Sequence, residues 1–234
     1  MSNYVQNLSS DAWSSEIDFI NLDAANPYEK KGYFNRYFFV AEKAVAPYRR
    51  YPTTETDMPL TIVDAACGDG SGSAFLAEQF PLWRIIGVDC CGEAIDLAKA
   101  RYGGRFANVS FLNTTVQSLE GVKCDIFVSM ETLEHVTNDT MHEILGKVAH
   151  DILLPGGRFV ASMPRLRPRE STKKRPGHIN ELYYQQFKYE LGGYFPFVEF
   201  YSFDRYANIV PDTPDANLMV ALCRKWCRSN VFNG

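Results

Sequence analysis

The sequence lacks several features that would assign it to common protein classes. No apolar run approaches the roughly 20 residues of a membrane-spanning helix, and there is no internal repeat or low-complexity segment. The first residues, Met1 to Tyr4, do not begin a basic stretch followed by an apolar one, so we expect no signal peptide. The 28 acidic residues outnumber the 24 basic ones. The chain therefore lacks both a predicted membrane span and an overall basic field for nucleic acid.

Paired metal-binding cysteines are also missing. Of six cysteines, only Cys223 and Cys227 are spaced like metal ligands, and no second pair accompanies them. Four of the six lie in or beside predicted strands and turns of a medium-sized core. We therefore expect reduced thiols and a cytoplasmic location.

What the chain does contain is enough apolar sequence for one substantial core. Hydrophobic residues make up 46% of its 234 residues, which fits one α/β domain. We expect a single domain over 1–234. An arm and helix over the cofactor and substrate site are predicted for 1–50, and a cofactor-binding core for 60–163. A substrate-side loop, helix and edge hairpin are predicted for 164–234.

One strand, turn and helix organise the rest of the chain. An apolar run ends at Asp64, small residues follow as far as Gly72, and a helical stretch begins there. Such a turn lets backbone approach a ligand at the strand's carboxyl end, where the helix N-terminus favours a negative group. A nicotinamide-binding turn needs G-x-G-x-x-G, but counting from Gly68 the third position is Ser73. This argues against a nicotinamide-dependent oxidoreductase.

Strands and helices alternate regularly from residue 60 onward, which predicts a doubly wound, mostly parallel, Rossmann-like α/β sheet of seven strands. The last two strands leave no room for a full helix between them, so we expect an antiparallel C-terminal edge hairpin. The predicted strands cover 60–64, 83–88, 108–112, 123–129, 157–162, 198–203 and 218–222. The predicted helices cover 28–46, 72–80, 92–102, 139–150 and 179–191.

The second of these strands ends at Asp89. A carboxylate at the tip of the strand beside the glycine turn is placed to accept hydrogen bonds from a ribose. The alternative is an acid that only caps the following helix.

Ordered motifs resemble those of class I S-adenosylmethionine (SAM) methyltransferases. Asp64 to Gly70 matches the usual D-x-G-x-G-x-G, with Ala66 in place of the first glycine. Asp125 to Val136 resembles the fourth motif, and Leu154 to Val160 resembles the strand opening that follows. The resemblance covers roughly 30–225. Within the superfamily, the run from Met130 to Val136 looks most like ubiquinone-biosynthesis O-methyltransferases.

The resemblance implies a set of SAM contacts. A cation or tyrosine from the helix before the first strand would meet the SAM carboxylate, and Arg36 or Tyr37 is placed to do so. Alternatively, Arg36 is a surface side chain lying over aromatic neighbours. Thr115 stands where the family often has an adenine-binding acid, so we expect that contact to pass to the backbone of Val116. The predicted cofactor-binding residues are Arg36, Asp64, Ala66, Cys67, Gly68, Gly70, Asp89, Cys90, Thr115, Val116 and Met130.

Catalytic candidates follow the fourth strand. If a helix begins there, Glu131, Glu134 and His135 share one face and offer oxygen and nitrogen ligands to a divalent cation. His178 would close this site from a later loop, an arrangement similar to the metal site of small-RNA 2′-O-methyltransferases. Two alternatives stay open: His135 acts alone as a general base, or it only packs under the cofactor.

The acceptor is less well defined than the cofactor. We expect methyl transfer from SAM to a hydroxyl of a small molecule. Alternatives are a metal-dependent RNA 2′-O-methyltransferase and a SAM-binding protein without turnover. The segment Arg165 to Arg175 carries six basic residues and one acid. It is either a flap that meets RNA or a phosphorylated acceptor, or a solvated loop.

Overall fold

A computed structural model describes residues 35–45, 59–166, 177–203, 209–212 and 216–226. The predicted arm, most of the basic segment and Cys227 lie outside these ranges. Within them, no helix is both long and apolar enough to cross a membrane.

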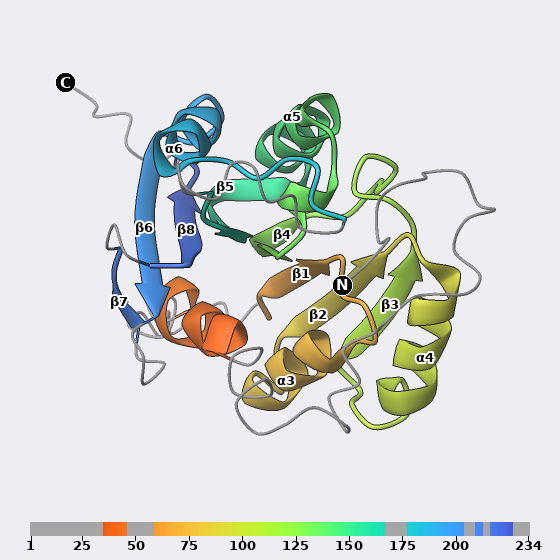
Figure 1. Cartoon of the computed structure of the whole chain (residues 1–234). Coiled ribbons are helices and arrows are strands. Elements are labelled where there is room, and N and C mark those ends of the chain that lie inside the picture. Colours follow the sequence, from red (N-terminus) through yellow and green to blue (C-terminus); the bar gives the residue numbers. More distant parts are fainter. Residues whose placement is uncertain (1–34, 46–58, 167–176, 204–208, 213–215, 227–234) are drawn as a thin grey trace.

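The domain is built on one eight-stranded sheet, with strand order β3-β2-β1-β4-β5-β8-β6-β7 (Figure 1). The five strands from β3 to β5 pair in parallel, and β8 pairs antiparallel with both β5 and β6. The bounds are β1 Thr61–Ala65, β2 Arg84–Asp89, β3 Val109–Asn113, β4 Cys124–Met130, β5 Leu153–Pro164, β6 Phe197–Phe203, β7 Ile209–Pro211 and β8 Leu218–Arg224.

The predicted doubly wound α/β fold and antiparallel C-terminal pair are confirmed, but the count of seven strands is wrong by one. The additional strand is β7, which pairs with β6 through only three residues. Three residues that end in a proline carry too little alternation to be recognised as a strand. β7 lies at the edge of the sheet, where a proline is tolerated.

Helices cover both faces of the sheet, because neighbouring residues of each central strand are buried on opposite sides. Ile62, Ile126 and Val160 pack on the face of α3 Ser71–Gln79 and α4 Gly92–Tyr102, whereas Val63 and Phe159 pack on the other. That second face is covered by α5 Asn138–Gly146, its π-helical extension η3 Lys147–Ile152, and α6 Tyr184–Gly192. Residues 35–39 and η1 Val40–Ala44 form one more helical segment on the α3 side.

Two predicted helices differ from the observed ones near the carboxyl ends of the strands. Only one 3₁₀ turn, η2 Leu133–His135, follows β4. The helix predicted at 179–191 begins at Tyr184, because the backbone amides of Ile179 and Asn180 both donate to the carbonyl oxygen of Glu134. This loop is thereby attached to η2, at the edge of the sheet where the glycine turn also lies.

Candidate functional site

The turn after β1 has a strained backbone that leaves an open space. Ala66, Gly68 and Gly70 have φ angles of 53°, 55° and 80°, a region that costs a residue with a Cβ atom more than it costs glycine. A Cβ at Gly70 would lie 2.8 Å from Cβ of Ala98, so packing excludes a side chain there. A Cβ at Gly68 would meet no atom within 4 Å. The turn therefore presents backbone to an open volume at Gly68.

Asp89 fixes the shape of this turn. Its two carboxylate oxygens accept hydrogen bonds from the backbone amides of Gly68 and Cys91, each at 2.9 Å. Cys91 is the N-cap residue of α4, so Asp89 also contacts the start of that helix. The side chain is buried. Its ribose contact remains a prediction, and the structure adds a role in holding the turn.

Asp64 is the buried acid beneath the turn. Ser73 donates to its Oδ2 at 2.6 Å, and the Tyr37 hydroxyl donates to its Oδ1 at 3.2 Å. Burial raises the pKa of Asp64 to about 7, against the lowering effect of these two hydrogen bonds. Gly72 makes the tyrosine contact possible, because a Cβ there would lie 1.9 Å from Cζ of Tyr37. Sequence reasoning missed Ser73 and Gly72 as partners of this network.

The other predicted cofactor residues lie around the same edge. Cys67 is buried and Cys90 is exposed. The Thr115 hydroxyl accepts a hydrogen bond from the amide of Ser118, so it already shapes its own turn. Val116 and Met130 are each 9% exposed and contribute apolar surface.

Arg36 and Glu131 form an ion pair at the carboxyl end of β4. Nη2 of Arg36 lies 3.3 Å from Oε2 of Glu131, and both side chains are largely covered. Ser162 donates to the other carboxylate oxygen of Glu131 at 2.8 Å. Arg36 thus contacts β4 while its neighbour Tyr37 contacts Asp64 of β1. No signal in the sequence singled out Ser162.

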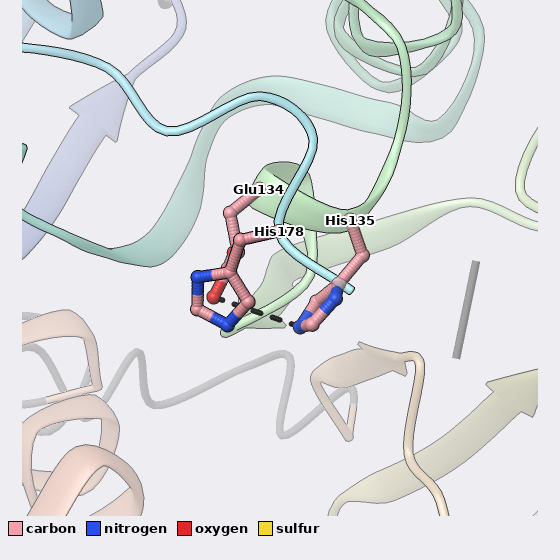
Figure 2. A group of neighbouring side chains, drawn as sticks. All are labelled: Glu134, His135 and His178. Atoms are coloured by element: carbon pink, nitrogen blue, oxygen red, sulfur yellow. Dashed lines mark ion pairs between the residues drawn. The ribbon is translucent and has the colours of Figure 1, made fainter. Parts of the chain in front are cut away.

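A separate group of three potential metal ligands lies just beyond. Ligand atoms of Glu134, His135 and His178 all lie within 4.8 Å of one another. Figure 2 shows the Glu134 carboxylate from η2 beside the two imidazole rings, with His178 supplied by the later loop. Ring centroids of the two histidines are 4.7 Å apart. The predicted approach of His178 to Glu134 and His135 is therefore observed.

Each histidine of this group is oriented by a partner on Nδ1. Nδ1 of His135 lies 2.9 Å from the carbonyl oxygen of Gly177, and Nδ1 of His178 lies 2.5 Å from Oε1 of Glu181. A proton on Nδ1 serves both contacts and leaves Nε2 of each ring with its lone pair. Metal-binding histidines are commonly held in this way by a carbonyl or a carboxylate.

Glu134 is the most unusual member of the group. It is fully buried, and neither carboxylate oxygen accepts a hydrogen bond from a described residue. Burial, with the charge of Glu131 as a smaller cause, raises the pKa of Glu134 well above its usual range. Burial also lowers the pKa of His135, which favours the neutral imidazole that a metal requires. A buried carboxylate beside two oriented imidazoles fits a divalent cation.

The prediction that Glu131 shares a helical face with Glu134 and His135 is wrong. Glu131 has a φ of 51° directly after β4, and the helical turn begins only at Leu133. This backbone directs the Glu131 carboxylate toward Arg36 and Ser162, so it is not a member of the three-residue group.

The described part of the basic segment does not present a free cation. Arg165 is buried, forms an ion pair with Asp212, and lies over the ring of Tyr184. Its charge therefore stabilises the loop after β7.

The core of the chain is similar to known proteins. The model of a family described as a methyltransferase domain matches residues 62–157. Over these residues the chain is similar to that family. The matched residues span β1 to the start of β5 and so contain the glycine turn, Asp89, Glu131 and Glu134. The predicted resemblance to class I methyltransferases is confirmed for this domain.

Curated relatives share this domain at modest identity. A ubiquinone biosynthesis O-methyltransferase from Bartonella tribocorum is 28% identical over 166 residues, 64% of each chain. A trans-aconitate 2-methyltransferase from Deinococcus radiodurans is 30% identical over 133 residues, 57% of this chain and 47% of that one. The matched region thus spans between about half and just under two thirds of these relatives' length.

Solved structures confirm the fold of the domain. The N-methyltransferase NodS from Bradyrhizobium japonicum WM9, in complex with S-adenosylhomocysteine, superimposes with a TM-score of 0.61. Identity is 19%, and coverage is 90% of this chain and 93% of that one. Magnesium protoporphyrin IX methyltransferase from Synechocystis, also with bound S-adenosylhomocysteine, gives 0.59 at 15% identity, with 86% and 88% covered.

Proposed function

We propose that this protein transfers a methyl group from SAM to a hydroxyl of a small molecule, with a divalent cation held by Glu134, His135 and His178. The observation that carries the proposal is the position of this group. It lies beyond β4, at the same edge of the sheet as the glycine turn of a methyltransferase domain. Oxygen acceptors are also what the names of several relatives indicate, among them the Bartonella O-methyltransferase.

The turn and the strand tips would bind the cofactor. The open volume at Gly68 gives an adenosyl group access to backbone, and Asp89 holds the turn in that shape while offering its remaining lone pairs to a ribose. Arg36 and Tyr37 lie over the tips of β4 and β1, within reach of an amino-acid group placed there. SAM supplies a methyl group already activated on a sulfonium sulfur, so the protein mainly aligns the acceptor.

The three-residue group would bind and deprotonate the acceptor. Three protein ligands leave coordination positions open, as in catalytic rather than structural metal sites. A divalent cation there lowers the pKa of a hydroxyl that it binds. Glu134 gains a charged partner for its buried carboxylate, and the partners on Nδ1 keep both imidazoles directed at the site.

RNA 2′-hydroxyl methylation is the second candidate. The approach of His178 to Glu134 and His135 favours it, because this was the feature that resembled small-RNA 2′-O-methyltransferases. The ion pair of Arg165 with Asp212 weighs against it, since that charge is already used within the fold. An RNA substrate would make binding fall steeply with salt concentration.

One set of assays tests the proposal. S-adenosylhomocysteine binding is measured by calorimetry, and S-adenosylhomocysteine production is measured on hydroxylated aromatics, sugars and RNA ends, with and without a chelator. We expect binding, turnover on a small hydroxylated acceptor, and loss of turnover on chelation that Mg²⁺ or Mn²⁺ restores. Turnover that survives chelation would assign His135 as a lone base. Binding without turnover on any acceptor would overturn the enzymatic proposal.

A further inference from the structure

Two adjacent residues connect the cofactor turn to the cation site. Tyr37 donates to Asp64 at the tip of β1, and Arg36 forms an ion pair with Glu131 at the tip of the neighbouring strand β4. One turn of the 35–39 helix therefore touches both halves of the site. Any ligand that displaces Arg36 from Glu131 also alters the environment of the cation group.

Glu131 is held in one defined position. Its Oε1 accepts from Ser162 at 2.8 Å, its Oε2 faces Arg36 at 3.3 Å, and its backbone amide lies 3.0 Å from the Ser162 hydroxyl. The fully buried Ser162 provides a rigid anchor on β5. In this position, Glu131 stays outside the group formed by Glu134, His135 and His178.

Glu131 is nonetheless close enough to act on that group. Only Thr132 and Leu133 separate it from Glu134, and both glutamates lie in the short segment that follows β4. While Arg36 neutralises Glu131, a cation at the group gains little from this carboxylate and is repelled by the guanidinium. Once Arg36 has another anionic partner, the full charge of Glu131 favours a cation at short range and low dielectric.

We infer that Arg36 exchanges partners between Glu131 and the carboxylate of the bound cofactor, so that cofactor binding releases Glu131 to the divalent cation. This inference rests on the proposed function. Arg36 is the positioning residue. In one state it pairs with Glu131, and in the other it pairs with the cofactor carboxylate. The cofactor and the cation then bind cooperatively, and each must strengthen the binding of the other by the same factor.

The test measures binding and requires no turnover. Mn²⁺ is titrated into the full chain by calorimetry, alone and with saturating S-adenosylhomocysteine or 5′-methylthioadenosine. The first ligand has the amino-acid carboxylate and no sulfonium charge, and the second has the adenosine and thioether but no carboxylate. We expect the homocysteine compound to strengthen Mn²⁺ binding by at least about fivefold, as in typical coupled sites. 5′-Methylthioadenosine should have no effect.

Variants assign the effect to the ion pair. In Arg36→Gln, Mn²⁺ should bind more tightly than to the wild type without any ligand, and the added effect of S-adenosylhomocysteine should disappear. Glu131→Gln, which is nearly isosteric, should also lose the effect while still binding both ligands separately. Arg224→Gln is the matched control. Arg224 is the last residue of β8, and it forms its ion pair with Glu199, away from the candidate site. It should show wild-type coupling.

The outcomes separate this inference from the proposed function. If Mn²⁺ and S-adenosylhomocysteine both bind the wild type but independently, the exchange of Arg36 is wrong and the methyltransferase proposal stands. Equal enhancement by both ligands would also overturn the exchange. If S-adenosylhomocysteine does not bind at all, the proposed function itself fails.

Discussion

Glu181 holds His178 through a contact of 2.5 Å between its Oε1 and Nδ1 of the imidazole. The carboxylate fixes which ring nitrogen carries the proton and leaves Nε2 directed at Glu134 and His135. A second residue thus controls whether the loop after the basic segment completes the candidate cation site.

The variant Glu181→Ala should therefore weaken divalent cation binding. Loss of a partner that orients a metal-binding histidine typically costs about 10- to 100-fold in affinity. Calorimetry with Mn²⁺ measures the effect, and S-adenosylhomocysteine affinity should change little. Glu143→Gln, an exposed acid on α5, serves as the control. Unchanged Mn²⁺ affinity in Glu181→Ala would show that His178 is not a ligand.

Gly72→Ala should disrupt the packing of Tyr37 on α3. The new Cβ would lie 1.9 Å from Cζ of the buried tyrosine, so the ring must move away from Asp64. Forced overpacking of this kind costs about 1–3 kcal/mol of unfolding free energy, and we also expect weaker S-adenosylhomocysteine binding. Thermal unfolding and calorimetry measure the two effects.

Two further variants test the cause of this loss. Gly192→Ala adds the same methyl group where no atom lies within 4 Å, and it should leave stability nearly unchanged. Adding Tyr37→Ala to Gly72→Ala removes the clash, so the two effects should be less than additive. Strict additivity would mean that the two side chains do not compete for this space.

His135→Ala should lower turnover far more than it weakens SAM binding. His135 lies with Glu134 and His178, whereas the glycine turn and Asp89 form the predicted adenosyl site. Removing one of three ligands, or a lone base, removes an interaction that acts on the acceptor. Steady-state kinetics paired with S-adenosylhomocysteine calorimetry measure both quantities. Wild-type turnover in this variant would leave His135 with a packing role only.

The sequence was sufficient to predict the sheet but not the geometry of every site residue. Alternating strands and helices, and the glycine turn after Asp64, identified the doubly wound core because period and turn chemistry are local. The left-handed backbone of Glu131 could not be anticipated, since a non-glycine residue there has no sequence signature.

Contacts between distant residues were harder still. Ser162 reaches Glu131 from the neighbouring strand β5, and Gly72 makes room for Tyr37 35 residues earlier. Neither pairing leaves a periodic pattern. His178 was the exception, because its residue type completed a ligand set that Glu134 and His135 had already suggested.

Asp64 should make stability depend on pH in the direction opposite to that of a typical acid. Burial raises its pKa from 3.8 in the unfolded chain to about 7 in the fold, so between these values the folded state binds more protons. Stability from this group is fully present below about pH 4 and is lost as the pH rises toward 7. One pKa unit corresponds to about 1.4 kcal/mol, so the loss amounts to a few kcal/mol.

Asp64→Asn should remove this dependence, whereas Asp96→Asn, which changes an exposed acid on α4, should retain it. Urea unfolding of the three proteins from pH 4 to 8 measures the difference, and parallel curves for wild type and Asp64→Asn would contradict a raised pKa at this position.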